Sequence, residues 1–282
     1  MYSYFKKNIR SAVVSVVLFS CGLLLSACGG ISIVSTSSDK APDKHVDVSK
    51  IPNAVPRNEP RSRYGNPKSY VVFGKRYYVM ESSKGFVEKG IASWYGTKFH
   101  GRRTSSGETY DMYAMTAAHK NLPLPTYVKV TNLNNGKHII VKVNDRGPFH
   151  ENRVIDLSYT AAIKLDIIKK GTGLVEVRVL EAGQPTSVDS GEGAPVETAS
   201  VSNNSGGFYI QVGSFSNLVN AEKLRQKLGP FGDHLVKISQ AVVSGDTLYR
   251  VRIGPLTDID QSDSIVFKLD DYGVIEHRIV VN

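Results

Sequence analysis

The sequence predicts two folded domains, a small β-barrel followed by a compact α+β domain, behind an N-terminal export signal. Three features lead to this prediction: a strong β-hairpin signal in the middle of the chain, an internal repeat near its C-terminus, and two polar stretches that separate the parts. The 282 residues are 41% hydrophobic and 22% charged, a composition that is typical of globular domains and excludes a disordered or fibrous protein.

An export signal comes first along the chain. Basic residues near the N-terminus precede an apolar run over residues 12–25, and this run leads into Leu-Ser-Ala-Cys28. The run is short and interrupted by serine and glycine, which disfavours the alternative of a transmembrane anchor. It resembles a bacterial lipoprotein signal, which implies cleavage before Cys28 and lipidation of that residue, palmitate included. The residue after Cys28 is Gly29 and not an aspartate, which in such signals implies an outer-membrane anchor facing the periplasm.

Charge and cysteine count narrow the classes of function. The net charge of +9 raises the question of a nucleic-acid partner, but an exported protein meets no nucleic acid. The 2 Cys residues exclude a disulfide scaffold and a multi-cysteine zinc module. The 7 His residues show no metal-ligand spacing, so neither a metal nor another cofactor is expected. Basic residues gather between residues 57 and 103, where they either steer an anionic substrate or form an ordinary solvated surface.

Two polar stretches divide the chain. Residues 28–69 begin at the lipidated cysteine and are rich in Ser, Pro, Lys and Asp without periodicity, so we expect a flexible tether. Pulled straight, such a tether would span roughly 130 Å. Residues 182–207, rich in Gly, Ser, Pro and acidic residues, are expected to form a second linker. The folded domains then cover residues 70–181 and 208–282, after a signal peptide over residues 1–27.

The first domain has the pattern of a small β-barrel. Two strands, Tyr127–Leu133 and Lys137–Asn144, flank an Asn-Asn-Gly turn, which is a strong hairpin signal. Leu174–Leu180 alternates as another strand, and Ser158 is placed to cap a short helix. Several short strands with glycine-rich turns favour a barrel over a sandwich or a parallel sheet.

The second domain contains an internal repeat. Ile210–Phe215 (IQVGSF) recurs as Val251–Leu256 (VRIGPL), and apolar residues at helical spacing follow each copy. Two tandem β-α-β halves predict a ferredoxin-like arrangement, with four strands and two helices on one face of the sheet. The other face of that sheet is then open for binding.

Four short blocks in the first domain hold the residues suited to chemistry. They are GIASWYG (Gly90–Gly96), FHGRRTSSGE (Phe99–Glu108), TAAH (Thr116–His119) and VNDRGPF (Val143–Phe149). Each block alone has an ordinary structural explanation as core aromatics, a solvated loop carboxylate, a buried histidine or a common turn. Their combination carries more weight than any one of them.

Asp145 is the strongest single candidate in these blocks. Alternation along the strand places it on the same face as Val141 and Val143, at the mouth of an apolar surface. Partial loss of hydration should raise the pKa of this carboxyl toward the range of a general acid, unless Arg146 folds back onto it. Glu108 adds a second carboxyl from a glycine-flanked loop, and two carboxyl groups beside aromatic rings suit the cleavage of a glycosidic bond.

Over residues 65–181, these blocks resemble the rare lipoprotein A family of lytic transglycosylases. The resemblance implies that the first domain is a six-stranded double-psi β-barrel. The repeat is similar to a sporulation-related (SPOR) domain, whose family binds glycan strands stripped of stem peptides at the division site. The implied fold class is therefore mainly β plus α+β. The implied activity is endolytic cleavage between N-acetylmuramic acid and N-acetylglucosamine, without water, to a 1,6-anhydro product.

The chemistry of the family implies roles for three residues. A general acid protonates the bridging oxygen and the muramoyl 6-hydroxyl attacks the anomeric carbon, so one carboxyl can donate a proton and later accept one. The resemblance implies that Asp145 is this acid/base. Glu108 would support it by hydrogen bonding or by stabilising positive charge, and His119 would orient a carboxylate.

Substrate-binding residues are expected in both domains. In the barrel they are Trp94, Tyr95, Phe99, Arg102, Arg103, Thr104 and Arg146. Of these, Arg102 or Arg103 would pair with the lactyl carboxylate that a stripped muramic acid exposes. In the SPOR-like domain they are Gln211, Ser214, Phe215, Tyr249 and Arg252, although Phe215 is equally compatible with a core position.

The leading hypothesis is a lytic transglycosylase that is anchored in the outer membrane and acts on stripped peptidoglycan at the division septum. The alternative is a septal lipoprotein that binds peptidoglycan without cleaving it. The joint presence of Glu108, His119 and Asp145 favours the enzyme. The implied partners are stripped glycan strands and, through the lipid, the outer membrane; the sequence leaves septal protein partners open.

Overall fold

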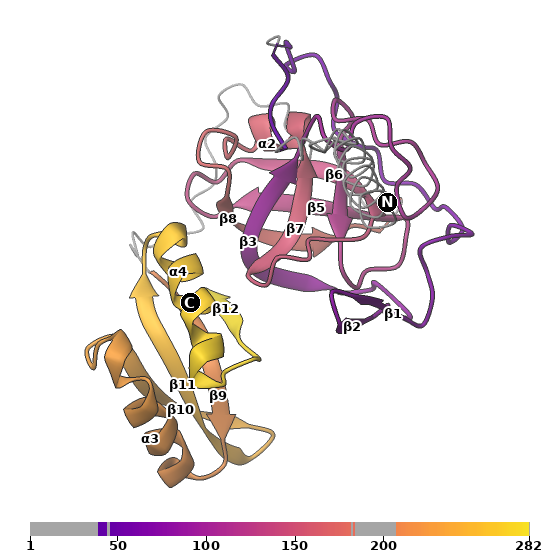
Figure 1. Cartoon of the computed structure of the whole chain (residues 1–282). Coiled ribbons are helices and arrows are strands. Elements are labelled where there is room, and N and C mark those ends of the chain that lie inside the picture. The colour runs from indigo at the N-terminus through magenta and orange to yellow at the C-terminus, as the bar shows by residue number, and fades with distance from the viewer. Residues whose placement is uncertain (1–38, 44–45, 182, 184–206, 282) are drawn as a thin grey trace, which may run out of the picture. The chain divides into compact units, whose positions relative to one another are not determined.

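The computed structural model describes residues 39–43, 46–181, 183 and 207–281. The predicted signal peptide, Cys28 and nearly all of the predicted linker over residues 182–207 lie outside these residues. Within them the chain forms a β-barrel, a small hairpin and an α+β domain (Figure 1). None of the helices that the structure describes is long and apolar enough to cross a membrane.

The barrel is closed by six strands, as predicted. These are β3 (Val87–Tyr95), β4 (Thr116–His119), β5 (Thr126–Asn132), β6 (His138–Asp145), β7 (Arg153–Ser158) and β8 (Gly173–Val179). They pair in the order β3-β7-β4-β6-β5-β8, and β8 closes the ring by pairing with β3. The β3–β7 and β4–β6 pairs are parallel and the others are antiparallel. Strands far apart in sequence therefore lie side by side, which brings the four sequence blocks together.

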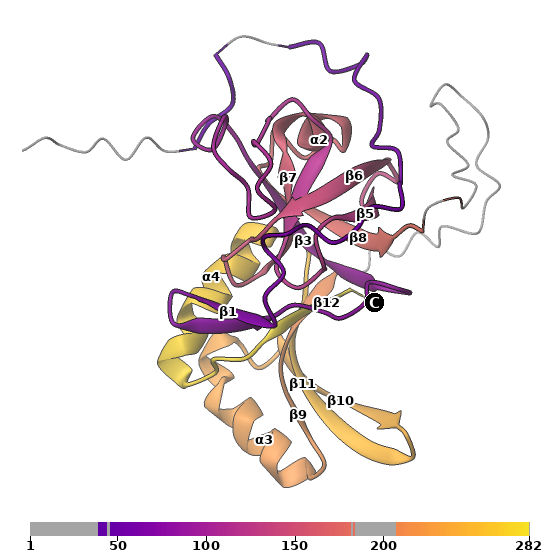
Figure 2. The same cartoon turned by 90° about the vertical axis from the view of Figure 1, so that its right-hand side faces the viewer.

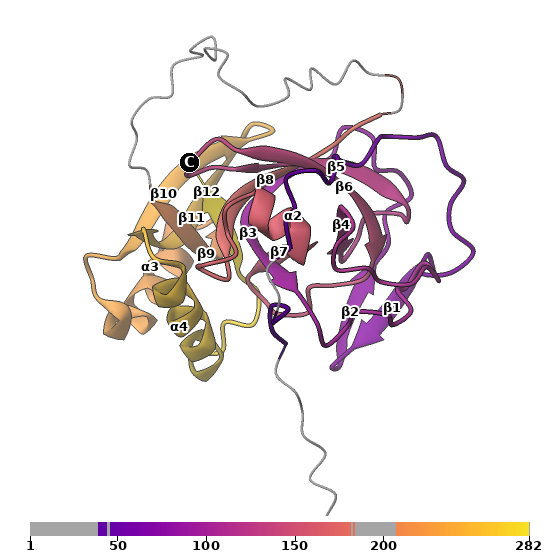
Figure 3. The same cartoon turned by 90° about the horizontal axis from the view of Figure 1, so that it is seen from above.

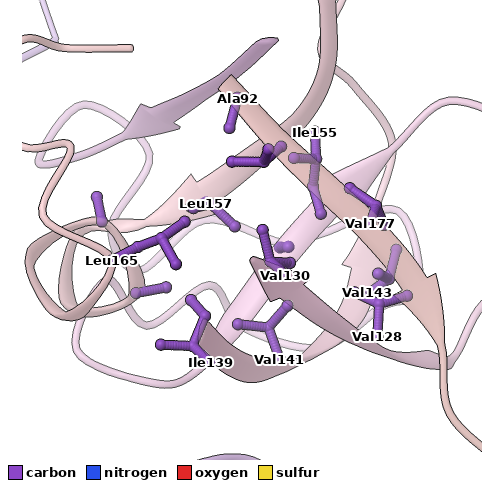
Figure 4. Close-up of a cluster of buried hydrophobic side chains, with 14 of the residues drawn as sticks. Ala92, Val128, Val130, Ile139, Val141, Val143, Ile155, Leu157, Leu165 and Val177 are labelled. Carbon is purple, nitrogen blue, oxygen red and sulfur yellow. The ribbon is translucent and has the colours of Figure 1, made fainter. Parts of the chain in front are cut away.

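Alternating apolar residues fill the barrel. The predicted hairpin forms between β5 and β6, and Gly136 adopts the positive φ of 72° that its turn requires. Val128, Val141 and Ile155 are among the fully buried side chains that meet inside (Figure 4). Helix α2 (Tyr159–Lys164) is capped by the Ser158 hydroxyl, as predicted. Its apolar residues join the same core, so α2 closes one end of the barrel (Figure 3).

A segment N-terminal to the barrel is held against it. We call residues 39–43 and 46–68 the strap. The backbone N–H of Ala54 donates to β6, and Asn66 exchanges two hydrogen bonds of 2.8 Å with the backbone of Leu124. The structure differs here from the expected flexible tether. Isolated hydrogen bonds, the ion pair of Glu59 with Lys142, and the packing of Ile51 and Ala54 on the barrel core hold the strap, and they leave no periodic pattern in the sequence.

The strap leads into a hairpin beside the VNDRGPF block. Strands β1 (Ser69–Val72) and β2 (Lys75–Tyr78) pair through a two-residue turn (Figure 2). The rings of Tyr70 and Tyr77 stack at 5.4 Å, and both contact Phe149. The hairpin thus packs on the segment that follows Asp145.

The C-terminal domain has the predicted ferredoxin-like order. Strand β9 (Phe208–Phe215) is followed by α3 (Leu218–Lys227), β10 (Val236–Val243), β11 (Asp246–Leu256), α4 (Ile259–Leu269) and β12 (Arg278–Val281), with short 3₁₀ helices at Gly229–Phe231 and Asp270–Tyr272. The sheet order is β10-β11-β9-β12, and every neighbouring pair is antiparallel. Both helices bury apolar residues on one face of this sheet (Figure 2). The prediction of two β-α-β halves is confirmed.

Candidate active site

Asp145 lies at the end of β6 and is held in one orientation. Its Oδ1 accepts hydrogen bonds from the backbone N–H of Ser105 (2.7 Å), the hydroxyl of Ser105 (2.6 Å) and the backbone N–H of Arg146 (2.7 Å). Among the described residues, none donates to Oδ2. The second oxygen is therefore the one that can face a substrate, while the first is fixed by the FHGRRTSSGE loop.

A β-bulge sets the direction of the Asp145 side chain. Val143 pairs with Ala117, but Asp145 pairs with Ala118, so Asn144 is an extra residue on β6. Val143 is fully buried inside the barrel, as predicted. The bulge interrupts the alternation that placed Asp145 on the same face as Val143. Asp145 instead lies beside Ala118, whose side chain packs in a second cluster with Tyr95.

Arg146 does not form an ion pair with Asp145. Its guanidinium donates to the carbonyl oxygens of Gly65 (2.7 and 2.9 Å) and Leu122 (2.6 Å), and it also bonds His119. Burial lowers the pKa of Arg146, but a guanidinium keeps its charge in proteins. These bonds tie the strap and the segment after β4 to the end of β6. In this arrangement Arg146 positions the segments around Asp145, and its predicted contact with substrate stays a prediction.

Glu108 lies in the same loop as Ser105 but contacts different residues of β6. Its carboxylate pairs with the Lys142 ammonium at 2.8 Å and accepts a hydrogen bond of 2.7 Å from the Asn144 amide. Burial opposes the charge of Lys142, but the hydrogen bonds that its ammonium donates to Glu108 and to Glu59 of the strap raise its pKa. Ser105 rather than Glu108 makes the hydrogen bonds to Asp145. Because its charge is compensated by Lys142, Glu108 is suited to fixing the loop on β6.

His119 is buried at the end of β4. Its Nδ1 accepts hydrogen bonds from the backbone N–H groups of Asn121 and Leu122, so this nitrogen carries no proton. Its Nε2 lies 3.2 Å from the Glu88 carboxylate. Burial lowers the pKa of His119 below its usual 6.5, which keeps the ring neutral near pH 7. The ring therefore shapes the turn after β4 and orients a carboxylate, that of Glu88.

The aromatic residues of GIASWYG are mostly internal. The Tyr95 ring is buried and stacks on Tyr110 at 4.1 Å, and its hydroxyl has no hydrogen-bond partner among the described residues. Trp94 is half-buried and meets Tyr159 edge to face. Phe99 is 39% exposed and lies against Tyr95, so it is the most accessible of the three predicted sugar-stacking rings.

The basic loop presents two exposed arginines, and they differ in whether the guanidinium has a partner. The Arg102 side chain is exposed, and no described residue forms a hydrogen bond or ion pair with its guanidinium. The Arg103 guanidinium instead donates to the Gly107 carbonyl within the loop. Thr104 is buried and donates to the Glu108 carbonyl, so it stabilises the loop from inside. Arg102 is therefore the best placed of these residues to meet an anionic sugar.

Asp156 on β7 is a second carboxyl that the sequence analysis missed. It pairs with Ala118 from the side opposite Asp145, and the Ser93 hydroxyl donates a hydrogen bond to it. Strands are about 4.8 Å apart, so the Cα atoms of the two aspartates lie about 10 Å from each other. Burial raises the pKa of Asp156 to about 6. Burial raises the pKa of Tyr95, and the charges of Tyr110 and of both aspartates raise it further.

Glycine is required where the chain passes over Asp156. Gly147 has a φ of 140°, and a side chain there would come within 3.7 Å of an Asp156 carboxylate oxygen. The VNDRGPF block therefore supplies both Asp145 and the backbone that flanks the second carboxyl. Within the described residues there is no group of three or more His, Cys, Asp or Glu side chains that could hold a metal ion. The site therefore contains two aspartates, Asp145 and Asp156, in different environments.

The predicted glycan-binding residues of the C-terminal domain fall on both faces of its sheet. Gln211 and Arg252 pair across β9 and β11, and their side chains lie 3.4 Å apart. Phe215 and Tyr249 also pair, but they pack against the apolar core under the helices. A register shift near Val251 separates these two pairs, because it changes the face to which later residues point.

Arginines extend the open face of this sheet beyond the predicted residues. Ser214 pairs with Arg250, and Arg278 pairs with Gln211 from the other side. Burial and the charges of Arg250 and Arg278 lower the pKa of Arg252. The sequence signal for this cluster was available, since the arginines occupy alternate positions on β11. Arg252 of this cluster was predicted, whereas Arg250 and Arg278 were not.

The chain matches known families in both domains. The model described as "Lytic transglycolase" matches residues 87–179, and the model described as "SPOR domain" matches residues 204–270. The closed barrel is accordingly the double-psi β-barrel that the resemblance implied.

Curated relatives carry one name. The protein named "Endolytic peptidoglycan transglycosylase RlpA" in Vibrio cholerae is 43% identical over 237 residues, which are 84% of this chain and 85% of that protein. Its namesake in Pseudomonas aeruginosa is 39% identical over 90% of this chain and 93% of the relative. The one in Neisseria meningitidis is 53% identical over 48% of this chain and 56% of the relative. The chain therefore belongs to the RlpA family.

Proposed function

We propose that this protein is an endolytic peptidoglycan lytic transglycosylase. It cleaves the bond between N-acetylmuramic acid and N-acetylglucosamine in glycan strands that lack stem peptides and leaves 1,6-anhydro ends. The observation that carries the proposal is the 43% identity over 85% of a relative that bears this activity in its name. The site supports it with two carboxyl groups on neighbouring parts of the barrel wall.

The two aspartates divide the proton transfers in this proposal. In a pair of carboxyls with different surroundings, the more buried one holds its proton at higher pH and serves as the acid. Burial gives Asp156 a pKa of about 6, which suits delivery of a proton to the bridging oxygen. Asp145, held by three donors on Oδ1, is oriented to take the proton of the muramoyl 6-hydroxyl with Oδ2. Asp145 and Asp156 thus share the acid/base role that the resemblance assigned to Asp145 alone.

The other predicted residues act around this pair. Glu108 fixes the loop that holds Asp145, and His119 fixes the turn after β4. Phe99 offers an exposed ring, and Arg102 an exposed guanidinium for the lactyl carboxylate of a stripped muramic acid. In the SPOR domain, Gln211 and Arg252, with Ser214 beside them, are the proposed contacts to the glycan. Phe215 and Tyr249 would support that surface from the core side.

The SPOR domain suggests the place of action. A domain of this family indicates a cell-wall protein of the periplasm that is directed to the division septum. We further propose that the precursor is cleaved before Cys28 and that lipid on Cys28 anchors it in the outer membrane. The support for the anchor is the lipobox sequence alone, which lies outside the described residues. Fractionation of cells that carry Cys28→Ala tests it, because the variant should leave the membrane fraction.

Incubation with amidase-treated glycan strands, followed by mass spectrometry, tests the enzymatic proposal. The full chain should release 1,6-anhydromuramoyl products, and both Asp145→Asn and Asp156→Asn should abolish them while the chain stays folded. Asp166→Asn, at an exposed aspartate paired with Lys137, is the matched control and should keep full activity. Intact strands that co-sediment with every version of the protein would instead identify the non-catalytic binding protein.

A further inference from the structure

The loop that follows β3 binds a carboxylate of the protein's own strap. The backbone N–H of Gly96 donates to one Asp39 oxygen at 2.8 Å, and the backbone N–H of Lys98 donates to the other at 3.1 Å. Two backbone N–H groups that converge on one carboxylate form a small anion-binding site. The ligand in this structure is internal.

The neighbouring strap residue lies on the same loop. The Lys40 carbonyl oxygen accepts hydrogen bonds from the Thr97 backbone N–H (3.0 Å) and from the Thr97 hydroxyl (3.1 Å). A Cβ atom at Gly96 would collide with that same carbonyl, so only glycine admits the strap so closely. Asp39 and Lys40 are exposed, so water competes for these contacts and a ligand can displace them.

This anion-binding loop lies next to the proposed catalytic groups. Gly96 follows Ser93 by three strand residues, a distance of about 10 Å, and Ser93 is the residue that holds Asp156. Burial is the main cause of the raised pKa of Asp156, and the charge of Asp39 adds a smaller contribution in the same direction. Ala41 of the strap packs on the aromatic cluster that contains Tyr95. The strap therefore contacts both the anion-binding loop and the aromatic cluster beside it.

We infer that the Gly96 and Lys98 amides form a subsite for a sugar-borne carboxylate, and that Asp39 fills this subsite as an internal competitor until substrate displaces it. The inference rests on the proposed function, because the lactyl group of a muramic acid without its peptide is the carboxylate that such a substrate carries. A stripped strand has one lactyl carboxylate on every muramic acid, so this subsite and Arg102 would bind different ones. A muramic acid that still bears its peptide has no free lactyl carboxylate. The subsite would thus select stripped strands through hydrogen bonds from two backbone N–H groups to a carboxylate, the same bonds that hold Asp39 of the strap.

Titration of N-acetylmuramic acid into the ¹⁵N-labelled full chain tests the subsite. The amide signals of Gly96 and Lys98 should shift, and in Asp39→Ala the midpoint should fall about fivefold because the internal competitor is gone. Asp39→Asn, which keeps the side-chain shape without its charge, should behave like Asp39→Ala. Asp43→Ala is the matched control, since Asp43 is a strap carboxylate that pairs with Lys40 instead of the amides, and its midpoint should equal that of the unaltered chain.

N-acetylglucosamine, which lacks the lactyl carboxylate, should leave both amide signals in place. Equal midpoints with and without Asp39, or equal shifts with the two sugars, would overturn the inference. The titration needs no turnover. If the chain cleaves no glycan, the proposed activity fails while the titration still decides the subsite. If it cleaves glycan, Asp39→Ala should also lower KM.

Discussion

Asp145 and Asp156 lie on opposite sides of strand β4, where both pair with the same residue, Ala118. The barrel achieves this by placing β6 and β7, which are consecutive in sequence, on either side of β4. Their environments differ, because Asp145 receives three hydrogen bonds on one oxygen and Asp156 is largely removed from water. Substitutions at or around the two aspartates should therefore have different effects.

Asp156→Asn should lower kcat by about 10²- to 10⁴-fold, the range associated with loss of a general acid. In the unaltered enzyme, kcat should fall as pH rises through about 6, because Asp156 then loses the proton that it must donate. The measurement is the pH profile of 1,6-anhydro product formation. An unchanged profile in Asp156→Asn would assign the proton donation to another group.

The same substitution should stabilise the folded protein at neutral pH. The pKa of Asp156 is about 6 in the folded state against 3.8 for a free aspartate, so the folded state binds this proton more tightly. Stability from this group is therefore present below pH 4 and lost as pH rises through about 6, by at most about 3 kcal/mol. Denaturant unfolding should show Asp156→Asn to be more stable than the unaltered chain at pH 7.5, and equal to it near pH 3.5. A destabilised variant at pH 7.5 would contradict the buried-charge argument.

Ser105→Ala should lower kcat on the order of tenfold and leave KM nearly unchanged, because it removes one of the bonds that orient Asp145. The backbone N–H of residue 105 still donates to Asp145, which limits the loss. Ser105→Thr keeps the hydroxyl and should recover most of the rate. Ser106→Ala is a suitable comparison, since the Ser106 hydroxyl bonds Thr104 within the loop rather than Asp145. A loss confined to KM in Ser105→Ala would indicate a substrate contact instead.

Arg146→Lys should lower the free energy of unfolding by about 2 to 4 kcal/mol, because an ammonium cannot reach the carbonyls of Gly65, His119 and Leu122 together. Turnover should fall as well, since these bonds hold the segment after Asp145.

Arg102→Gln should have the opposite effect, with an unchanged free energy of unfolding and a raised KM for stripped strands. Thermal unfolding and steady-state kinetics on both variants check this contrast. Intact stability in Arg146→Lys together with a raised KM would indicate that Arg146 is a substrate ligand.

The architecture was predictable where local patterns decide it. The Asn-Asn-Gly turn, the Ser158 cap and the repeat of IQVGSF as VRIGPL each specify a structure through a few neighbouring residues. The site was only partly predictable, since it depends on which strands become neighbours. Asp156 looks like an ordinary outward residue between Ile155 and Leu157, and nothing local shows that Ser93 lies beside it.

The bulge at Asn144 and the docking of the strap could not be predicted from the sequence pattern. The bulge at Asn144 inserts a single residue, and the alternation that predicted the face of Val143 gives no warning of it. The strap is built from residues that are also typical of disordered chains, and isolated contacts such as that of Asn66 with Leu124 hold it. Tertiary contacts of this kind become visible only once the barrel is formed.

The docked strap shortens the leash between membrane and enzyme. If lipid sits on Cys28 as proposed, residues 28–38 are all that separates the anchor from the first strap contact at Asp39. Eleven residues span at most about 40 Å even when fully stretched, less than a third of the length of the whole polar stretch. The barrel can then reach only the part of the cell wall that lies next to the membrane. Displacement of Asp39 by a stripped strand would leave the contacts of Lys40, Ala54 and Asn66 in place, so the enzyme would stay close to the membrane while it works.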